Sequence, residues 1–144
     1  MYTHILIPTD GSDLSRKAIR HGITLAKAVN AKVTAVTVST PFHVVSVEPA
    51  MVTDTPQTYQ KHMATVAAKY LGEVVAAAAA GVSCETVHVE HEHPYQAIID
   101  TANKRGCDLI VMASHGRRGV SAIVLGSETV KVLTHSTVPV LVYR

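Results

Sequence analysis

Residues 109–144 read LIVMASHGRRGVSAIVLGSETVKVLTHSTVPVLVYR. This stretch predicts a buried strand, a glycine-containing loop, a helix that opens on Gly126 and Ser127, and a last strand. A helix that follows such a loop presents unpaired backbone N–H groups and the positive end of its dipole, and both suit a phosphate. The stretch therefore predicts an α/β unit with a candidate anion site at the start of its helix.

The rest of the chain repeats the same alternation of strand and helix. Five segments favour β structure: residues 2–7, 32–38, 83–89, 108–113 and 138–143. ILI at 5–7 and LIVMA at 109–113 are continuously apolar, as strands covered on both faces must be. Apolar residues at three-to-four spacing predict the helices between them: one opened by Ser12 as N-cap and running to Val29, one over 59–78 with Gly81 as C′ residue, one over 95–104 closed by Gly106, and one over 127–135.

Strict alternation predicts an α/β fold with five parallel strands, right-handed crossovers and helices on both faces. The expected strand order is 3-2-1-4-5, and residues 1–144 are expected to form a single domain. Residues 40–56 lack periodicity and contain three prolines, so they predict a long, mobile loop after the second strand. In such sheets a ligand binds where the strand order reverses. That crevice lies between the first and fourth strands, where Pro8 to Ser12 and Met112 to Gly119 emerge.

Composition excludes several classes of function. Hydrophobic residues make up 47% of the 144 residues and charged residues 17%, which argues against disorder. A net charge of +2, without a basic stripe interleaved with aromatics, predicts no nucleic-acid partner. No apolar run is long enough for a membrane span, and the N-terminus lacks a signal-peptide pattern. Two distant cysteines without a CxxC spacing are typical of free thiols in a reducing cytosol, so we expect a cytoplasmic location.

Two segments together, IPTDGSDLSRKA at 7–18 and MASHGRRGVSAIVLGSETVKVLTHSTVPVLV at 112–142, resemble the universal stress protein family, and the likeness extends over the whole chain. The family signature G-x2-G-x9-G-(S/T) matches at Gly116, Gly126 and Ser127, while Ala113 occupies the first glycine position. The resemblance implies a flavodoxin-like fold of the adenine nucleotide alpha hydrolase type and ATP binding. It also implies homodimers built through the strand from Val138 to Tyr143.

The resemblance further implies twelve binding residues. Around the adenine and ribose it places Pro8, Thr9, Asp10 and Val38. The floor and the ribose contact would come from Met112, Ala113, His115 and Gly116. Phosphates would meet N–H and hydroxyl groups of Gly126, Ser127, Glu128 and Thr129, and Mg²⁺ would be held mainly by the phosphates themselves.

The chemistry of the glycines and hydroxyls independently agrees with this placement. Gly116 and Gly126 would let the backbone approach a ligand without an intervening Cβ, and both can adopt positive φ. Ser127 and Thr129 would add side-chain donors beside the helix-terminal amides. The methyl group of Ala113 would crowd a ligand that touches this position.

Other side chains fit the base and the sugar. Val38 and Met112 can sandwich a flat base, and Asp10 can accept a hydrogen bond from ribose or from the adenine amino group, or lie near a metal. Glu128 would stabilise the helix N-terminus by roughly 0.3–1 kcal/mol. Turned inward, the same carboxylate would repel a triphosphate.

Catalytic patterns are absent from the sequence. There is no GxxxxGK[ST] loop, and Ser114 with His115 does not form a G-x-S-x-G elbow. Without a dedicated base or a Mg²⁺-binding carboxylate pair, we expect binding with slow turnover at most. The cluster from His88 to His93 could hold zinc or nickel, or could be a solvated strand end; we predict no metal site. Arg117 and Arg118 could clamp phosphates or could be solvated loop charges.

These features together predict a cytoplasmic, homodimeric ATP-binding protein that acts as a stress-response sensor or regulator. Two alternatives remain open. One is a slow ATPase or nucleotide hydrolase, and the other is a dimeric interaction module of the same fold that binds no nucleotide.

Overall fold

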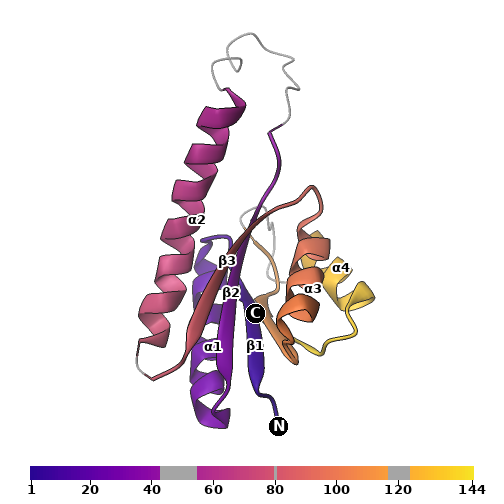
Figure 1. Ribbon diagram of the computed structural model, residues 1–144. Coiled ribbons are helices and arrows are strands. Elements are labelled where there is room, and N and C mark those ends of the chain that lie inside the picture. The colour runs from indigo at the N-terminus through magenta and orange to yellow at the C-terminus, as the bar shows by residue number, and fades with distance from the viewer. Residues whose placement is uncertain (43–54, 80, 117–123) are drawn as a thin grey trace.

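The computed structural model describes residues 1–42, 55–79, 81–116 and 124–144. Within them five parallel strands form one sheet in the order β3-β2-β1-β4-β5, as predicted (Figure 1). The strands are β1 (His4–Pro8), β2 (Lys32–Ser39), β3 (Cys84–Glu90), β4 (Leu109–Ala113) and β5 (Val140–Tyr143). Each differs from its predicted bounds by one or two residues.

Helices cover both faces of the sheet (Figure 1). One face carries α1 (Asp13–Val29) and α2 (Pro56–Ala78), and the other carries α3 (Pro94–Arg105) and α4 (Ser127–His135). Successive residues of a strand point to opposite faces. Ile5 and Ile7 therefore join the apolar core beneath α1 and α2, whereas Leu6 joins the core beneath α3 and α4, and all three are fully buried.

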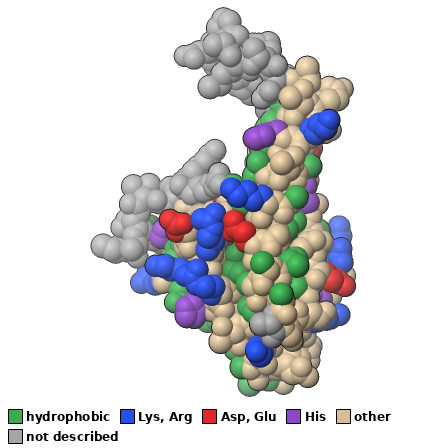
Figure 2. Space-filling model, turned by 90° about the vertical axis from the view of Figure 1, so that its left-hand side faces the viewer, with side chains coloured by type: hydrophobic (Ala, Val, Ile, Leu, Met, Phe, Trp, Pro, Cys, Tyr) green, Lys and Arg blue, Asp and Glu red, His purple; other side chains and the backbone are tan. Residues whose placement is uncertain are grey.

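The outer surface of the first face is polar along the line where α1 meets α2. Figure 2 shows acidic and basic side chains gathered on this face. Arg16 of α1 bonds Glu73 of α2 with Nε 3.0 Å from Oε2, and it also pairs with Asp13. This pair ties the two helices together across their exposed seam.

Local sequence explains most of the helix ends. Ser12 caps α1 by accepting a hydrogen bond from the Ser15 N–H, as predicted, and Gly106 ends α3 in the left-handed conformation with φ +70°. α2 begins earlier than predicted because the Thr55 side chain caps it and Pro56 suits its first turn. It ends at Ala78 as predicted, but the C-cap is Ala79, and Gly81, with φ +105°, lies two positions after the C-cap instead of at C′.

Part of the loop predicted over residues 40–56 falls outside the described residues, which omit 43–54, while Pro56 belongs to α2. In the parts of the chain that the structure describes, no helix is both long and apolar enough to cross a membrane. β5 forms one edge of the sheet and pairs only with β4 among the described strands.

Candidate functional site

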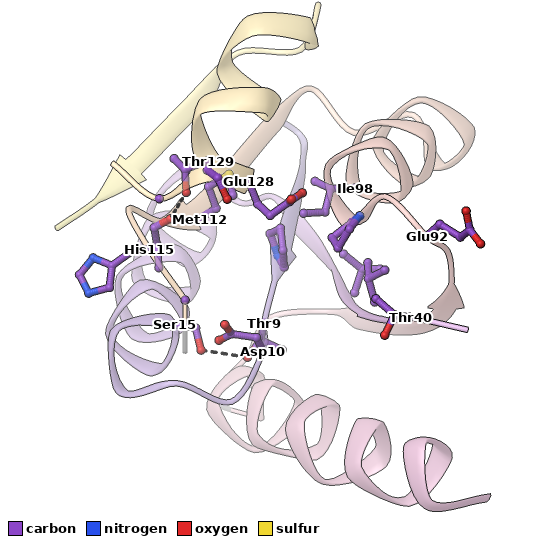
Figure 3. A pocket seen from close by; sticks show the side chains of 18 residues that line it. Thr9, Asp10, Ser15, Thr40, Glu92, Ile98, Met112, His115, Glu128 and Thr129 are labelled. Atoms are coloured by element: carbon purple, nitrogen blue, oxygen red, sulfur yellow. Dashed lines mark hydrogen bonds between the residues drawn. The ribbon is translucent and has the colours of Figure 1, made fainter. Parts of the chain in front are cut away.

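A cavity of about 530 Å³ opens at the carboxyl ends of the central strands β1 and β4 (Figure 3). It lies where the strand order reverses, as expected for a doubly wound sheet. All twelve residues that the sequence suggested line this one cavity: Pro8, Thr9, Asp10, Val38, Met112, Ala113, His115, Gly116, Gly126, Ser127, Glu128 and Thr129. Segments more than a hundred residues apart in the chain therefore meet here.

The turn after β1 is fixed by the side chain of Thr9, which is only 5% exposed. Its hydroxyl accepts a hydrogen bond from the Gly11 N–H at 3.2 Å and lies 3.2 Å from the Ser15 hydroxyl. Its backbone N–H donates to the carbonyl of Val36, and its carbonyl accepts from the Thr37 hydroxyl at 3.0 Å. The turn is thus anchored to both α1 and β2.

Asp10 leaves this turn towards the cavity and packs against the loop that follows β4. Its Oδ1 accepts a hydrogen bond from the Ser12 N–H at 3.0 Å. Its other oxygen lies so close to Gly116 that a Cβ at position 116 would collide with it. A side chain at position 116 would therefore displace the Asp10 carboxylate from its present position.

Gly126 also lies close to a neighbouring segment. A Cβ there would lie 3.1 Å from the Cα of His115, and the Gly126 N–H donates to the Ser114 carbonyl at 2.7 Å. Gly126 has φ −63°, and Gly116 does not have a left-handed φ either. Neither glycine uses the positive φ that it can adopt. The absence of a side chain instead leaves space for the Asp10 carboxylate at position 116 and for the close approach of His115 at position 126.

Gly126 is also the N-cap of α4, and no side chain caps this helix within the described residues. Ser127, at its first position, is exposed and lines the cavity. Thr129 is 2% exposed and donates its hydroxyl to the Ala113 carbonyl at 3.0 Å. Its single proton is thus committed to fastening α4 to β4, which differs from the phosphate donor that we expected.

The carboxylate of Glu128 bridges two helices. One oxygen accepts a hydrogen bond from the backbone N–H of Tyr95 in α3 at 2.8 Å, and the other lies 3.4 Å from the Lys131 Nζ. Glu128 also lines the cavity. It therefore adds negative charge beside the start of α4 while it satisfies an amide at the start of α3.

Apolar side chains form the opposite wall. Val38 packs against the same apolar cluster that includes Met112, Ile98 and Val36. Figure 3 shows Glu92 and Thr40 at the end of the cavity beyond Ile98. In the same view the ring of His115 points away from the other labelled side chains, although His115 lines the cavity.

Sequence reasoning missed six lining residues: Ser15, Val36, Thr40, Glu92, Pro94 and Ile98. Three of them carried a usable signal, and one of these, Thr40, directly follows β2. Glu92 and Pro94 follow β3, and the carboxyl ends of all parallel strands meet at one edge of a sheet. Ile98 is 5% exposed on α3 and is indistinguishable by pattern from an ordinary core residue.

The histidine-rich segment from His88 to His93 spans the end of β3 and includes Glu92, which lines the cavity. His88 pairs with Ser39, with Nε2 2.8 Å from Oγ, and His91 Nδ1 accepts a hydrogen bond from the His93 N–H at 2.8 Å. The rings of His91 and His93 are 6.0 Å apart and tilted. Within the described ranges, no three His, Cys, Asp or Glu side chains are grouped to hold a metal ion. Arg117 and Arg118, the suggested phosphate clamp, lie outside the described residues.

Both cysteines are free and neither lines the cavity. Burial raises the pKa of the Cys107 thiol to about 11 and also raises the pKa of Cys84. A thiol with a raised pKa is a poor nucleophile at neutral pH. These residues therefore act as small apolar side chains in the core.

The fold agrees with comparisons of the chain to known proteins. A model of the universal stress protein family matches residues 1–144. The chain therefore belongs to the universal stress protein family.

Three relatives show how far the similarity extends. The chain is 33% identical to universal stress protein MJ0531 of Methanocaldococcus jannaschii, over all of this chain and 83% of that protein. The structure of MJ0577, from the same organism, has a TM-score of 0.83 at 27% identity and covers 99% of this chain and 96% of that one. A universal stress protein in complex with cAMP has a TM-score of 0.69 at 25% identity and covers 99% of this chain and 97% of that one.

Proposed function

We propose that this protein binds an adenine nucleotide, ATP, in the cavity between β1 and β4, and acts as a cytoplasmic sensor or regulator in a stress response. The observation that carries the proposal is the convergence of an apolar wall, the Asp10 carboxylate and the uncapped start of α4 on one cavity of about 530 Å³. Cavities that hold small ligands combine such apolar walls with a few polar groups. The relative in complex with cAMP supports an adenine nucleotide as the ligand class.

In the proposed complex the base lies between the side chains of Val38 and Met112. Both line the cavity and belong to one apolar cluster, so they offer a base two non-polar surfaces. Asp10, held by its bond to the Ser12 N–H, accepts a hydrogen bond from a ribose hydroxyl. Glycine at 116 keeps that carboxylate in place, because any larger residue would displace it.

The phosphates lie at the start of α4. The first amides of a helix lack intrahelical partners, and the helix dipole favours negative charge there. Gly126 caps α4 without a side chain, and Ser127 adds a hydroxyl. We place any Mg²⁺ on the phosphates, where it neutralises their charge.

Calorimetric titration with ATP, ADP, AMP and cyclic AMP tests the proposal directly. Ser127→Asp is the informative variant, because an acid in the first turn stabilises a helix yet repels a phosphate at the same amides. We expect at least a tenfold loss of ATP affinity for Ser127→Asp, and a loss of about threefold for Ser127→Ala, which removes one hydrogen bond. Equal ATP affinity in all three proteins, or no binding of any of the four nucleotides, would refute the proposed site.

We further propose that two chains pair through β5. Leu141 is 46% exposed on this edge strand, and Val130 and Leu133 on the neighbouring α4 are 44% and 42% exposed. An apolar edge strand is a surface that invites pairing. Nucleotide binding at the start of α4 would then act close to the interface between the two copies.

A further inference from the structure

Glu128 is the second residue of α4, in the turn where the proposed phosphates bind. Its carboxylate has the same sign of charge as a phosphate. A carboxylate in this turn stabilises the empty helix but competes with an anionic ligand for the same dipole. If Glu128 is held firmly in this position, its charge repels any anionic ligand at the start of α4.

The hydrogen bonds at the start of α3 show that it is held firmly. Pro94 has no N–H, and the N–H groups of Gln96 and Ala97 both donate to the His93 carbonyl. The remaining donor of this turn is the Tyr95 N–H, which is bonded to Glu128 at 2.8 Å. His93, the N-cap of α3, provides no side-chain bond, so the Glu128 carboxylate serves as the cap of that helix.

The described lining of the cavity contains more acidic side chains than lysines and arginines. Of the lining residues that the structure describes, Asp10, Glu92 and Glu128 are acidic and none is a lysine or arginine. Lys131 pairs with Glu128 at 3.4 Å but does not line the cavity, and its side chain is 48% exposed, so water screens much of its charge. Within the described part of the cavity, a ligand with several negative charges therefore meets a fixed carboxylate whose neighbouring ammonium group, that of Lys131, is partly screened by water.

We propose that Glu128 is a specificity-determining residue that weakens binding in proportion to the negative charge of the phosphate chain. This inference rests on the proposed nucleotide site. It implies that uncomplexed ATP binds more weakly than AMP, and that ATP binds tightly only when Mg²⁺ has neutralised part of its charge. At separations of a few ångströms near a protein surface, one repelling charge changes affinity by about tenfold.

Titration of adenosine, AMP, ADP and ATP in EDTA tests the inference. The variant is Glu128→Gln, whose amide oxygen can still accept the Tyr95 N–H. We expect the affinity for ATP to rise about tenfold, that for AMP about threefold, and that for adenosine not to change. Glu85→Gln is the matched control, because it removes the same charge at the opposite end of the sheet, where Glu85 pairs with Arg105. Melting temperatures without ligand show that both variants are folded.

Two outcomes overturn the inference, and they are distinguishable. If the wild type binds nucleotides but Glu128→Gln leaves the ratio of ATP to AMP affinity unchanged, Glu128 does not set specificity and the nucleotide site stands. If none of the four ligands binds to either protein, the proposed function fails and the inference fails with it. Saturating Mg²⁺ supplies a further check, since it should reduce the difference between Glu128→Gln and wild type for ATP.

Discussion

At the residue scale, the same amino acid meets different physical requirements at different positions. Gly11 has φ +75°, and a Cβ there would also collide with the ring of Tyr70. Gly126 has an ordinary φ, and a Cβ there would make a tight contact of 3.1 Å with the Cα of His115. Gly72, in the interior of α2, has no neighbour within 4 Å of an added Cβ.

Two substitutions by alanine should therefore change stability in opposite directions. We expect Gly11→Ala to cost about 2–4 kcal/mol, because a left-handed alanine is strained and Tyr70 must move. We expect Gly72→Ala to increase stability by about 0.5–1 kcal/mol, since alanine is the better helix former and the space is open. Urea denaturation of both variants measures the two values. A stable Gly11→Ala protein would show that the turn after β1 can adopt another conformation.

His4 should make stability depend on pH in a defined range. His4 is 4% exposed and its Nε2 lies 2.7 Å from the Thr34 hydroxyl. Burial, with a further contribution from the charge of Lys32, lowers the pKa of His4 below the ordinary 6.5. The unfolded chain therefore takes up a proton near pH 6.5 that the folded chain does not, and stability falls as the pH drops below about 7.

The variant His4→Gln isolates this effect, because glutamine keeps a polar group near Thr34 but does not titrate. We expect it to lose less stability than wild type between pH 7.5 and pH 5, measured as urea midpoints. His62→Gln, which removes an exposed imidazole from α2, serves as the comparison. An identical pH profile for His4→Gln and wild type would contradict the assignment.

At the scale of elements, one buried hydroxyl fastens α4 to the sheet. The Thr129 hydroxyl donates to the Ala113 carbonyl at 3.0 Å. Valine has nearly the same shape as threonine but no hydroxyl, so Thr129→Val leaves that carbonyl without this donor. We expect a loss of about 1–2 kcal/mol and weaker nucleotide binding, because the start of α4 is then less firmly placed. Thr134→Val is the control, since the exposed Thr134 bonds only the Val130 carbonyl of its own helix, and we expect a change within about 0.5 kcal/mol. Equal effects of the two substitutions would argue against this role of Thr129.

The elements themselves were largely predictable, because their signals are local. The apolar runs ILI and LIVMA indicated strands covered on both faces, and Ser12 and Gly106 marked helix ends that the structure confirms. The partners of Glu128 and Thr129 were not predictable. Tyr95 and Ala113 lie 33 and 16 residues away in sequence, and these contacts exist only after α3 and α4 have packed on the same face.

At the scale of the whole molecule, the reversal of strand order between the first and fourth strands predicted where the cavity lies, without the use of any motif. Alternating strands and helices fix an all-parallel sheet, and the reversal between β1 and β4 then brings Asp10 and Gly116 together. The full lining of the cavity needed the structure, since Ile98 and Val36 reach it as buried residues whose sequence pattern is that of ordinary core positions.

The free edge of β5 is the remaining feature that concerns the molecule as a whole. The Pro139 carbonyl accepts a hydrogen bond from the Ile110 N–H of β4, and the Tyr143 carbonyl accepts one from the Ser114 N–H that follows β4. Because alternate residues of a strand bond to opposite sides, the backbone groups of Val140 and Val142 point to the open edge. If two chains pair there, the Val142 N–H takes part in the pairing. Val142→Pro removes that donor, and proline is tolerated on an edge strand where its N–H would face outward.

Light scattering on eluted protein at micromolar concentration should therefore give a dimer for wild type and a monomer for Val142→Pro, with similar far-ultraviolet circular dichroism. Val142→Thr keeps both the β-branched shape and the backbone donor, so it should remain dimeric. If the wild type is monomeric, the proposal that β5 joins two copies is wrong. If Val142→Pro is still dimeric, the interface does not depend on the edge of β5. Exposed Val130 and Leu133 on α4 would then be the first alternative to test, because they offer apolar surface without needing the strand edge.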